Sequence, residues 1–230
     1  MFIGHAAAAL AAKRAAPRAS LGVLLGAATF IDLLWPVFLL LGWETVRIAP
    51  GITAFTPLDF TSYPISHSLI AVLWWSLLAG GVYFAATRQR NEAITVGLLV
   101  LSHWVLDAIA HRPDLPILPT HGPKVGLGLW HSVPATLVVE TLFFAACVAV
   151  YLGTTRARDA AGRWGFWALI AFFLLVYFAN AFGPPPPDTR SLAWVAMAAW
   201  ILPLWAWWAD RHREPTPQVP ETAFGARPGA

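Results

Sequence analysis

Hydrophobic residues along the chain fall into runs long enough to cross a lipid bilayer as helices. A spanning helix needs about 20 predominantly apolar residues, and such runs cover residues 20–42, 67–87, 93–111, 130–152, 164–182 and 191–209. A shorter alanine-rich segment, Met1 to Ala12, reaches only about 18 Å as a helix. We expect it to lie in the membrane interface or to enter the bundle part-way as a half-helix. The pattern predicts an all-α, polytopic membrane bundle of six full spans plus a short N-terminal helix.

The composition supports a membrane protein. Hydrophobic residues make up 58% of the chain and charged residues 12%, roughly half the charged fraction of soluble domains. There is no helix or stripe rich in Lys and Arg, so nucleic acid is not an expected partner. We expect residues 1–213 to form one transmembrane domain. The polar, proline-rich residues 214–230 are expected to form a disordered cytoplasmic tail.

Lysine and arginine are distributed unequally between the connecting segments. If the spans alternate, one side collects Lys13, Arg14, Arg18, Arg88, Arg90, Arg156, Arg158, Arg163, Arg211, Arg213 and Arg227. The other side has only Arg47, Arg112, Lys124 and Arg190. The positive-inside rule therefore predicts a multi-pass protein with a cytoplasmic C-terminus, which in a bacterium places it in the inner membrane. The long connections 43–66 and 112–129 are then expected to face the periplasm.

One polar stripe lies within the apolar run at 93–111. His103, Asp107 and His111 are spaced four residues apart, so they occupy one face of a helix. Ionisable groups at membrane depth are costly and usually face a bundle interior or a wet cavity. The stripe is either a hydrogen-bonded seam between helices or one wall of a metal site.

Further histidines and carboxylates fall on segments that end toward the predicted outer side. Taken singly, they fit interfacial residues, loop residues or hydrogen-bonding partners between helices. Taken together they favour a metal site, because several segments direct such side chains to one region. For His67 to reach His103, the connection 43–66 must fold inward or the helices must tilt. The additional candidate ligands are His5, Asp32, His67, His121 and His131.

The ligand types restrict the metal. Histidine and carboxylate without cysteine suit Zn²⁺, and also Mn²⁺ or Fe²⁺. The single Cys147 lies inside an apolar run, which excludes a cysteine-based zinc site and an intramolecular disulfide. Glu140, in the middle of a span, is interpreted as a seam residue or as an outer partner of the site.

The order of these residues resembles the inner-membrane metal-dependent hydrolases of the YdjM-like family. The elements that carry the resemblance are His5, Asp32, the pair His67-Ser68, and Ser102-His103 followed by Asp107, over roughly residues 1–132. The chain departs from the family pattern at Leu34, where a second aspartate is usual. The resemblance implies a membrane-embedded hydrolase with these residues in its site.

The same order is distantly similar to the zinc-dependent phospholipase C and single-strand nuclease superfamily. That likeness implies one to three metal ions. One ion would be held by Asp32, His67, His103 and Asp107, and a second by His5 with Asp107. A third would use His131 with His111 or His121, although Ala135 stands where that superfamily usually has a glutamate.

We therefore expect a metal-dependent hydrolase that cleaves a phosphoester or ester of a lipid-like substrate with a metal-activated water. Asp32 and Asp107 are the expected catalytic carboxylates. Two alternatives remain open. The same stripe suits a metal-ion or proton transporter, and it also suits a structural membrane protein whose polar residues only hold helices together.

Overall fold

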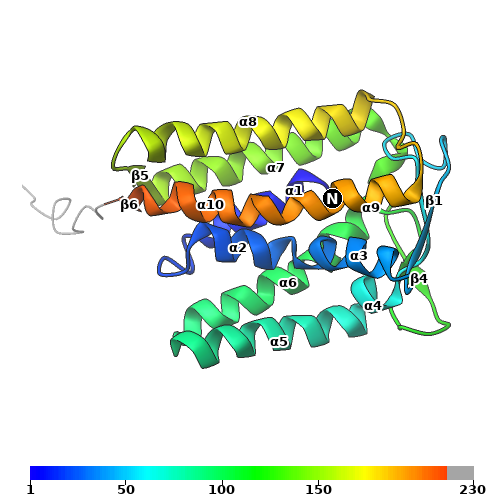
Figure 1. Ribbon diagram of the computed structural model, residues 1–230, viewed down its shortest axis with the longest axis horizontal. Helices are drawn as coiled ribbons and strands as arrows, with labels where there is room; N and C mark the ends of the chain where they lie inside the picture. The colour runs from blue at the N-terminus through cyan, green and yellow to red at the C-terminus, as the bar shows by residue number, and fades with distance from the viewer. Residues whose placement is uncertain (217–230) are drawn as a thin grey trace, which may run out of the picture.

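The computed structural model describes residues 1–216, and it confirms a predominantly helical bundle. Five helical segments within these residues are long and apolar enough to cross a membrane. Figure 1 shows them running roughly parallel along the long axis of the molecule. They are α5 (Leu69–Thr87), α6 (Arg90–Ala110), α7 (Val133–Thr154), α8 (Ala160–Phe182) and the segment Thr189–Arg211, made of α9 (Thr189–Met197), η2 (Ala198–Trp200) and α10 (Ile201–Arg211).

The predicted span at 20–42 is broken into two helices. Helices α2 (Leu21–Ala28) and α3 (Phe30–Leu40) meet at an angle of 55° and count as a sixth span only if taken together. The break lies at Thr29, whose hydroxyl donates to the carbonyl of Leu25 at 2.8 Å. Such back-bonding competes with the helical ladder and bends helices. The bend places Asp32 in the first turn of α3.

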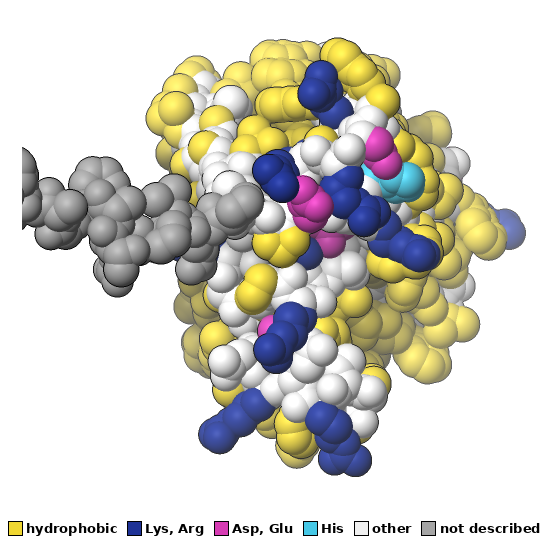
Figure 2. Space-filling model, turned by 90° about the vertical axis from the view of Figure 1, so that its left-hand side faces the viewer, with side chains coloured by type: hydrophobic (Ala, Val, Ile, Leu, Met, Phe, Trp, Pro, Cys, Tyr) yellow, Lys and Arg dark blue, Asp and Glu magenta, His cyan; other side chains and the backbone are white. Residues whose placement is uncertain are grey.

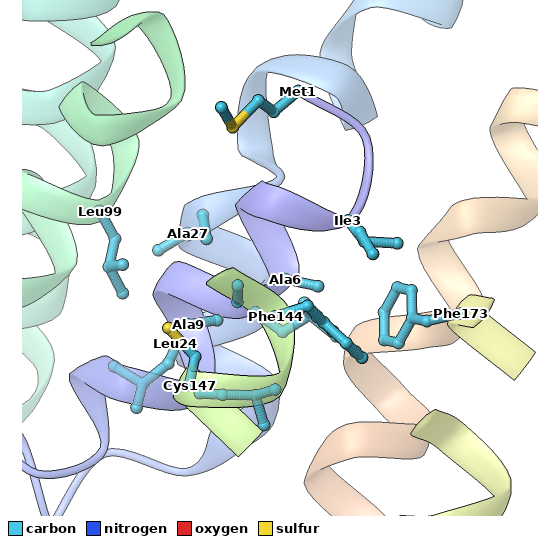
Figure 3. Packing of buried hydrophobic residues seen from close by; sticks show 14 of the residues in the cluster. Met1, Ile3, Ala6, Ala9, Leu24, Ala27, Leu99, Phe144, Cys147 and Phe173 are labelled. Carbon is cyan, nitrogen blue, oxygen red and sulfur yellow. The ribbon is translucent and has the colours of Figure 1, made fainter. Parts of the chain in front are cut away.

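Helix α1 (Ile3–Ala12) is buried within the bundle and packs against α2, α6 and α7. Figure 3 shows Ile3 and Ala6 beside Phe144 and Phe173, which belong to α7 and α8. The small alanine side chains allow neighbouring helices to approach closely, as small residues do at helix interfaces in membranes. Of the two arrangements expected for this segment, the half-helix inside the bundle is the one observed.

The connections gather at two opposite ends (Figure 1). At one end, β1 (Thr45–Ile48) pairs antiparallel with β2 (Leu58–Ser62), and β3 (Leu115–Pro116) with β4 (Lys124–Val125). Helix α4 (Pro64–His67) and η1 (Leu129–His131) belong to the same connections. At the other end, β5 (Thr155–Ala157) pairs with β6 (Arg213–Pro215). The two long connections expected on one side of the membrane therefore lie together.

Figure 2 looks onto the end that carries β5 and β6, where Lys and Arg side chains are prominent. Strand β6 corrects the predicted start of the disordered tail. Glu214 and Pro215 pair with β5, and the guanidinium of Arg156 lies 2.7 Å from the carboxylate of Glu214. Residues 217–230 of the expected tail lie outside the described residues.

A buried ion pair holds the C-terminal end of α1. The ammonium of Lys13 lies 2.7 Å from Asp210 on α10, and both side chains are less than 10% exposed. Asp210 also accepts hydrogen bonds from the Leu21 amide and the Tyr151 hydroxyl. The distribution of Lys and Arg predicts that Lys13 lies at the cytoplasmic surface. It turns inward because Asp210, once buried, needs a cation to compensate its charge.

Cysteine labelling tests the orientation. Thr120→Cys should react with an impermeant thiol reagent from the periplasmic side, and Ala160→Cys should react only after the cells are opened, because the two exposed positions lie at opposite ends. The native Cys147 is buried and provides the unreactive background. Labelling of Ala160→Cys alone in intact cells would reverse the orientation.

Replacing Lys13 should destabilise the bundle. Lys13→Met leaves Asp210 without its cation, and breaking a buried pair costs about 3–5 kcal/mol. Arg14→Met, at the exposed neighbouring position, should change the unfolding free energy little. Equal unfolding midpoints for the two variants in detergent would contradict this role of the ion pair.

Candidate functional site

Four side chains from three separate elements meet beside the bend of the first span. His103 Nε2 lies 3.5 Å from Asp32 Oδ1 and 3.2 Å from Asp107 Oδ2. His67 Nε2 lies 3.6 Å from the same oxygen of Asp32 and 3.8 Å from the same oxygen of Asp107. Helix α3 supplies Asp32, α4 supplies His67 and α6 supplies the other two. We call Asp32, His67, His103 and Asp107 the four-residue cluster.

The short helix α4 explains how His67 reaches this depth. The chain is extended at Ser68, so α5 begins only at Leu69 and α4 is free to take a different direction. The Ser68 hydroxyl joins the two helices, since it donates to the Pro64 carbonyl at 2.6 Å and accepts from the Ala71 amide at 3.2 Å. The connection 43–66 thus folds so that His67 meets the stripe on α6.

The other carboxylate oxygen of Asp107 faces a second group. Its Oδ1 lies 3.1 Å from His5 Nε2 and 4.0 Å from His111 Nε2. The Met1 amine contacts the same oxygen and lies 3.3 Å from His5 Nε2. The rings of His5 and His103 stack in parallel with their centroids 3.7 Å apart. Asp107 therefore lies between two sets of nitrogen atoms, one on each oxygen.

In both histidines of the four-residue cluster, the ring nitrogen that points away from the cluster, Nδ1, has an acceptor. Ser66 Oγ donates to Glu44 at 2.6 Å, so the contact of 2.7 Å between His67 Nδ1 and Ser66 Oγ requires the histidine to donate. His103 Nδ1 lies 2.9 Å from the Ala28 carbonyl and must donate as well. In the neutral imidazole, both assignments leave a lone pair on Nε2, directed toward the cluster. Such outer partners fix the tautomer of histidines that bind metals.

His111 is held in the same way from the outer loops. Its Nδ1 lies 3.1 Å from Asp114, which also accepts a hydrogen bond from the Tyr63 hydroxyl at 3.2 Å. Burial, together with the neighbouring Asp114, raises the pKa of Tyr63 well above its usual value, so the hydroxyl stays protonated and donates. Arg112 Nε donates to the other Asp114 oxygen at 2.9 Å and orients the carboxylate.

Glu140 holds the N-terminus of α1. It is fully buried on α7, and its Oε2 accepts from the amides of Phe2, Ile3 and Gly4 at 2.9, 3.0 and 3.4 Å. These amides have no partner within the helix, and a carboxylate at a helix N-terminus is stabilised by the helix dipole. Glu140 therefore positions the first turn of α1, which carries His5.

Burial is uneven across the four-residue cluster. The side chains of His67, His103 and Asp107 are 4% exposed or less, whereas that of Asp32 is 49% exposed. His103 Nε2 is buried and has no hydrogen-bond partner among the described residues. Asp32 is thus the one member of the cluster that is open to the surroundings.

The structure brings six of the eight predicted ligands together and leaves two apart. His5, Asp32, His67, His103, Asp107 and His111 form the connected group described above. His121 and His131 are exposed, and neither side chain bonds to that group within residues 1–216. On the 3₁₀ turn η1, Trp130 takes the inward position instead, with its ring centroid 4.5 Å from that of His111. Consecutive residues of such a turn point in different directions, so His131 faces outward.

The spacing of the cluster can be compared with that of a metal site. Four atoms each about 2.1 Å from a tetrahedral zinc ion lie about 3.4 Å from one another. The four measured separations in the cluster range from 3.2 to 3.8 Å. Two triads, His5–His103–Asp107 and Asp32–His67–His103, each offer ligand atoms within 4.8 Å of one another. Each triad offers donors that suit a divalent ion, and the two triads share His103.

Sequence reasoning missed the outer partners Glu44, Ser66 and Asp114. Ser66 precedes His67 directly and Asp114 lies three residues after His111, so their proximity to a histidine was the available signal. Glu44 gave none, because it lies 23 positions before His67 and reaches Ser66 only through the fold of the outer connection.

No protein-family model, curated protein or solved structure matches this chain.

Removing the carboxylate of Glu140 should loosen α1. Glu140→Ala leaves three amides of the first turn without an acceptor, and each unsatisfied buried donor costs about 1–3 kcal/mol. Hydrogen exchange of residues 2–5 should become faster and the unfolding temperature should fall. Glu140→Gln keeps an acceptor oxygen and should lie closer to wild type. Unchanged exchange in Glu140→Ala would refute the capping role.

Proposed function

We propose that the four-residue cluster binds a divalent metal ion, with Zn²⁺ favoured, and that the protein is a membrane-embedded metal-dependent hydrolase. One observation carries the proposal. Asp32, His67, His103 and Asp107 converge from three elements with His-to-Asp separations of 3.2 to 3.8 Å, while both histidines are oriented by acceptors on Nδ1. Mn²⁺ and Fe²⁺ suit the same donors.

Asp107 supports a second ion beside the first. Its two oxygens face different nitrogen sets, with His67 and His103 on one side and His5, His111 and the Met1 amine on the other. A second ion on that side would take the place of the amine. A carboxylate placed in this way suits a bridge between two cations. The second set depends on α1, and hence on its capping by Glu140.

The proposed reaction is hydrolysis of a phosphoester or ester. A divalent ion held by these residues would supply a water of lowered pKa and stabilise charge developing on the substrate. Asp32 is the half-exposed member of the cluster, and its Oδ1 faces His67 and His103. Its remaining oxygen has no protein partner among the described residues, so it is available to accept a hydrogen bond from water and orient it.

The position of the cluster favours a lipid-like substrate. Asp32 follows directly after the bend of an apolar helix pair, and the neighbouring Phe30 packs edge-on against Trp75 of α5. An ester carried by an apolar chain can reach such a position from the bilayer. The resemblance to the YdjM-like hydrolases supports the same chemistry. The cluster lies toward the end opposite the basic face (Figures 1 and 2), which favours access from the periplasmic side.

Metal analysis of purified variants tests the proposal. His103→Ala and Asp107→Ala should each lose most of the bound metal, because each removes a ligand near the centre of the group. Ser66→Ala removes only an outer partner of His67 and should weaken metal affinity by roughly 10-fold or more. His121→Ala, at an exposed histidine, should keep the wild-type metal content. Equal metal content in all four variants would refute the assigned ligands.

Hydrolysis is measured with the same proteins. The metal-loaded wild type should release product from phospholipid or lipid-ester vesicles, and chelation should abolish the release. Asp32→Asn should retain folding and lose most activity. A folded wild type that never contains metal would favour the structural alternative, and metal binding with transport but without hydrolysis would favour the transporter.

A further inference from the structure

A second polar feature lies at the opposite end of the bundle, far along the chain from the cluster. A cavity of about 200 Å³ opens between the connection that leads into α8 and the end of α10. It belongs to the basic face that Figure 2 shows. Its lining residues are Arg158, Trp207, Trp208, Arg211 and His212.

Both arginines of this cavity are held in place by neighbouring groups. Arg158 Nη2 donates to the Arg211 carbonyl at 2.5 Å, which draws its side chain across to the end of α10. The guanidinium of Arg211 lies over the ring of Trp207, 4.7 Å from its centroid. Two planar cations with several free donors thus share one small space, the arrangement that suits a phosphate group.

The nearest carboxylate is already engaged. Asp159 Oδ2 lies 2.7 Å from His212 Nδ1, and Asp159 Oδ1 accepts from the Gly162 amide at 2.8 Å. These two hydrogen bonds lower the pKa of Asp159, which stays ionised and paired. Neither Arg158 nor Arg211 forms an ion pair with a carboxylate within the described residues. The residues that line the cavity therefore include two arginines and no carboxylate.

Exposed tryptophans place the cavity at the level of the membrane interface. Trp207 and Trp208 line it and are 44% and 43% exposed, and Trp164 and Trp167 of α8 are 67% and 44% exposed. Indole rings concentrate where lipid headgroups meet acyl chains. A ligand that binds here has its charged group among the arginines and its apolar part against these rings.

We propose that this cavity binds the phosphate of an anionic phospholipid, such as phosphatidylglycerol, between α8 and α10. Basic pockets between membrane helices bind lipid headgroups in this way. The site is independent of the proposed hydrolase centre, because none of its residues contacts the cluster.

Native mass spectrometry with the full chain in detergent tests the proposal. Phosphatidylglycerol should bind more tightly than phosphatidylcholine to the wild type. Arg158→Gln with Arg211→Gln should weaken phosphatidylglycerol binding by roughly 30-fold, since each arginine near an anionic headgroup contributes about fivefold. The matched control is Arg88→Gln with Arg90→Gln, which removes the same charge from the α5–α6 turn at the same end.

Three results would overturn the proposal. Equal weakening in both double variants would mean that overall charge, and not this cavity, attracts the lipid. Equal binding of phosphatidylcholine and phosphatidylglycerol by the wild type would remove the role of the anionic headgroup. Displacement of the lipid by millimolar glycerol 3-phosphate would identify a soluble anion as the ligand. Unfolding temperatures measured without added lipid establish that both double variants are folded.

Discussion

A carboxylate buried among apolar helices must be surrounded by donors or cations, and the bundle is arranged around one that meets this condition. Asp107 is 3% exposed, and the groups that face its two oxygens come from α1, α4 and α6. Without them, an ionised group at this depth would cost several kcal/mol. The Met1 ammonium contacts Asp107 directly and compensates its charge, and in our proposal the histidines hold a metal ion that would do the same.

Helix α1 is present in the bundle because both of its ends are compensated. Glu140 accepts hydrogen bonds from the amides of its first turn, and Lys13, just beyond its last turn, forms an ion pair with Asp210. A helix of ten residues is too short to cross a bilayer. The carbonyls of its last turn are satisfied by the amides that follow it, whereas the amides of its first turn could not lie in apolar surroundings without Glu140. Two acidic residues on distant helices therefore make a half-helix possible, and through it the placement of His5.

The outer connections serve the same centre. Glu44 and Asp114 lie in the two long connections, and each orients a histidine through its far nitrogen, with Ser66 as the intermediary in the first case. Loops placed on a rigid helical scaffold often carry functional groups in this way. The arrangement supports the proposed hydrolase, because a catalytic metal needs ligands of fixed direction on one side and an open approach, here beside Asp32, on the other.

Hydrophobic length and helical periodicity determined much of this protein from the sequence alone. The apolar runs predicted the helices, and the spacing of His103, Asp107 and His111 predicted their common face, because both properties are local. The tertiary structure decided the rest. Thr29 bends the first span so that Asp32 turns toward the stripe, α4 breaks from α5 so that His67 reaches inward, and η1 directs Trp130 inward and leaves His131 outside. Each outcome depends on partners distant in sequence, such as Glu44 for His67 and Glu140 for His5. A pattern of residue types does not contain those partners, because they meet only when the helices pack.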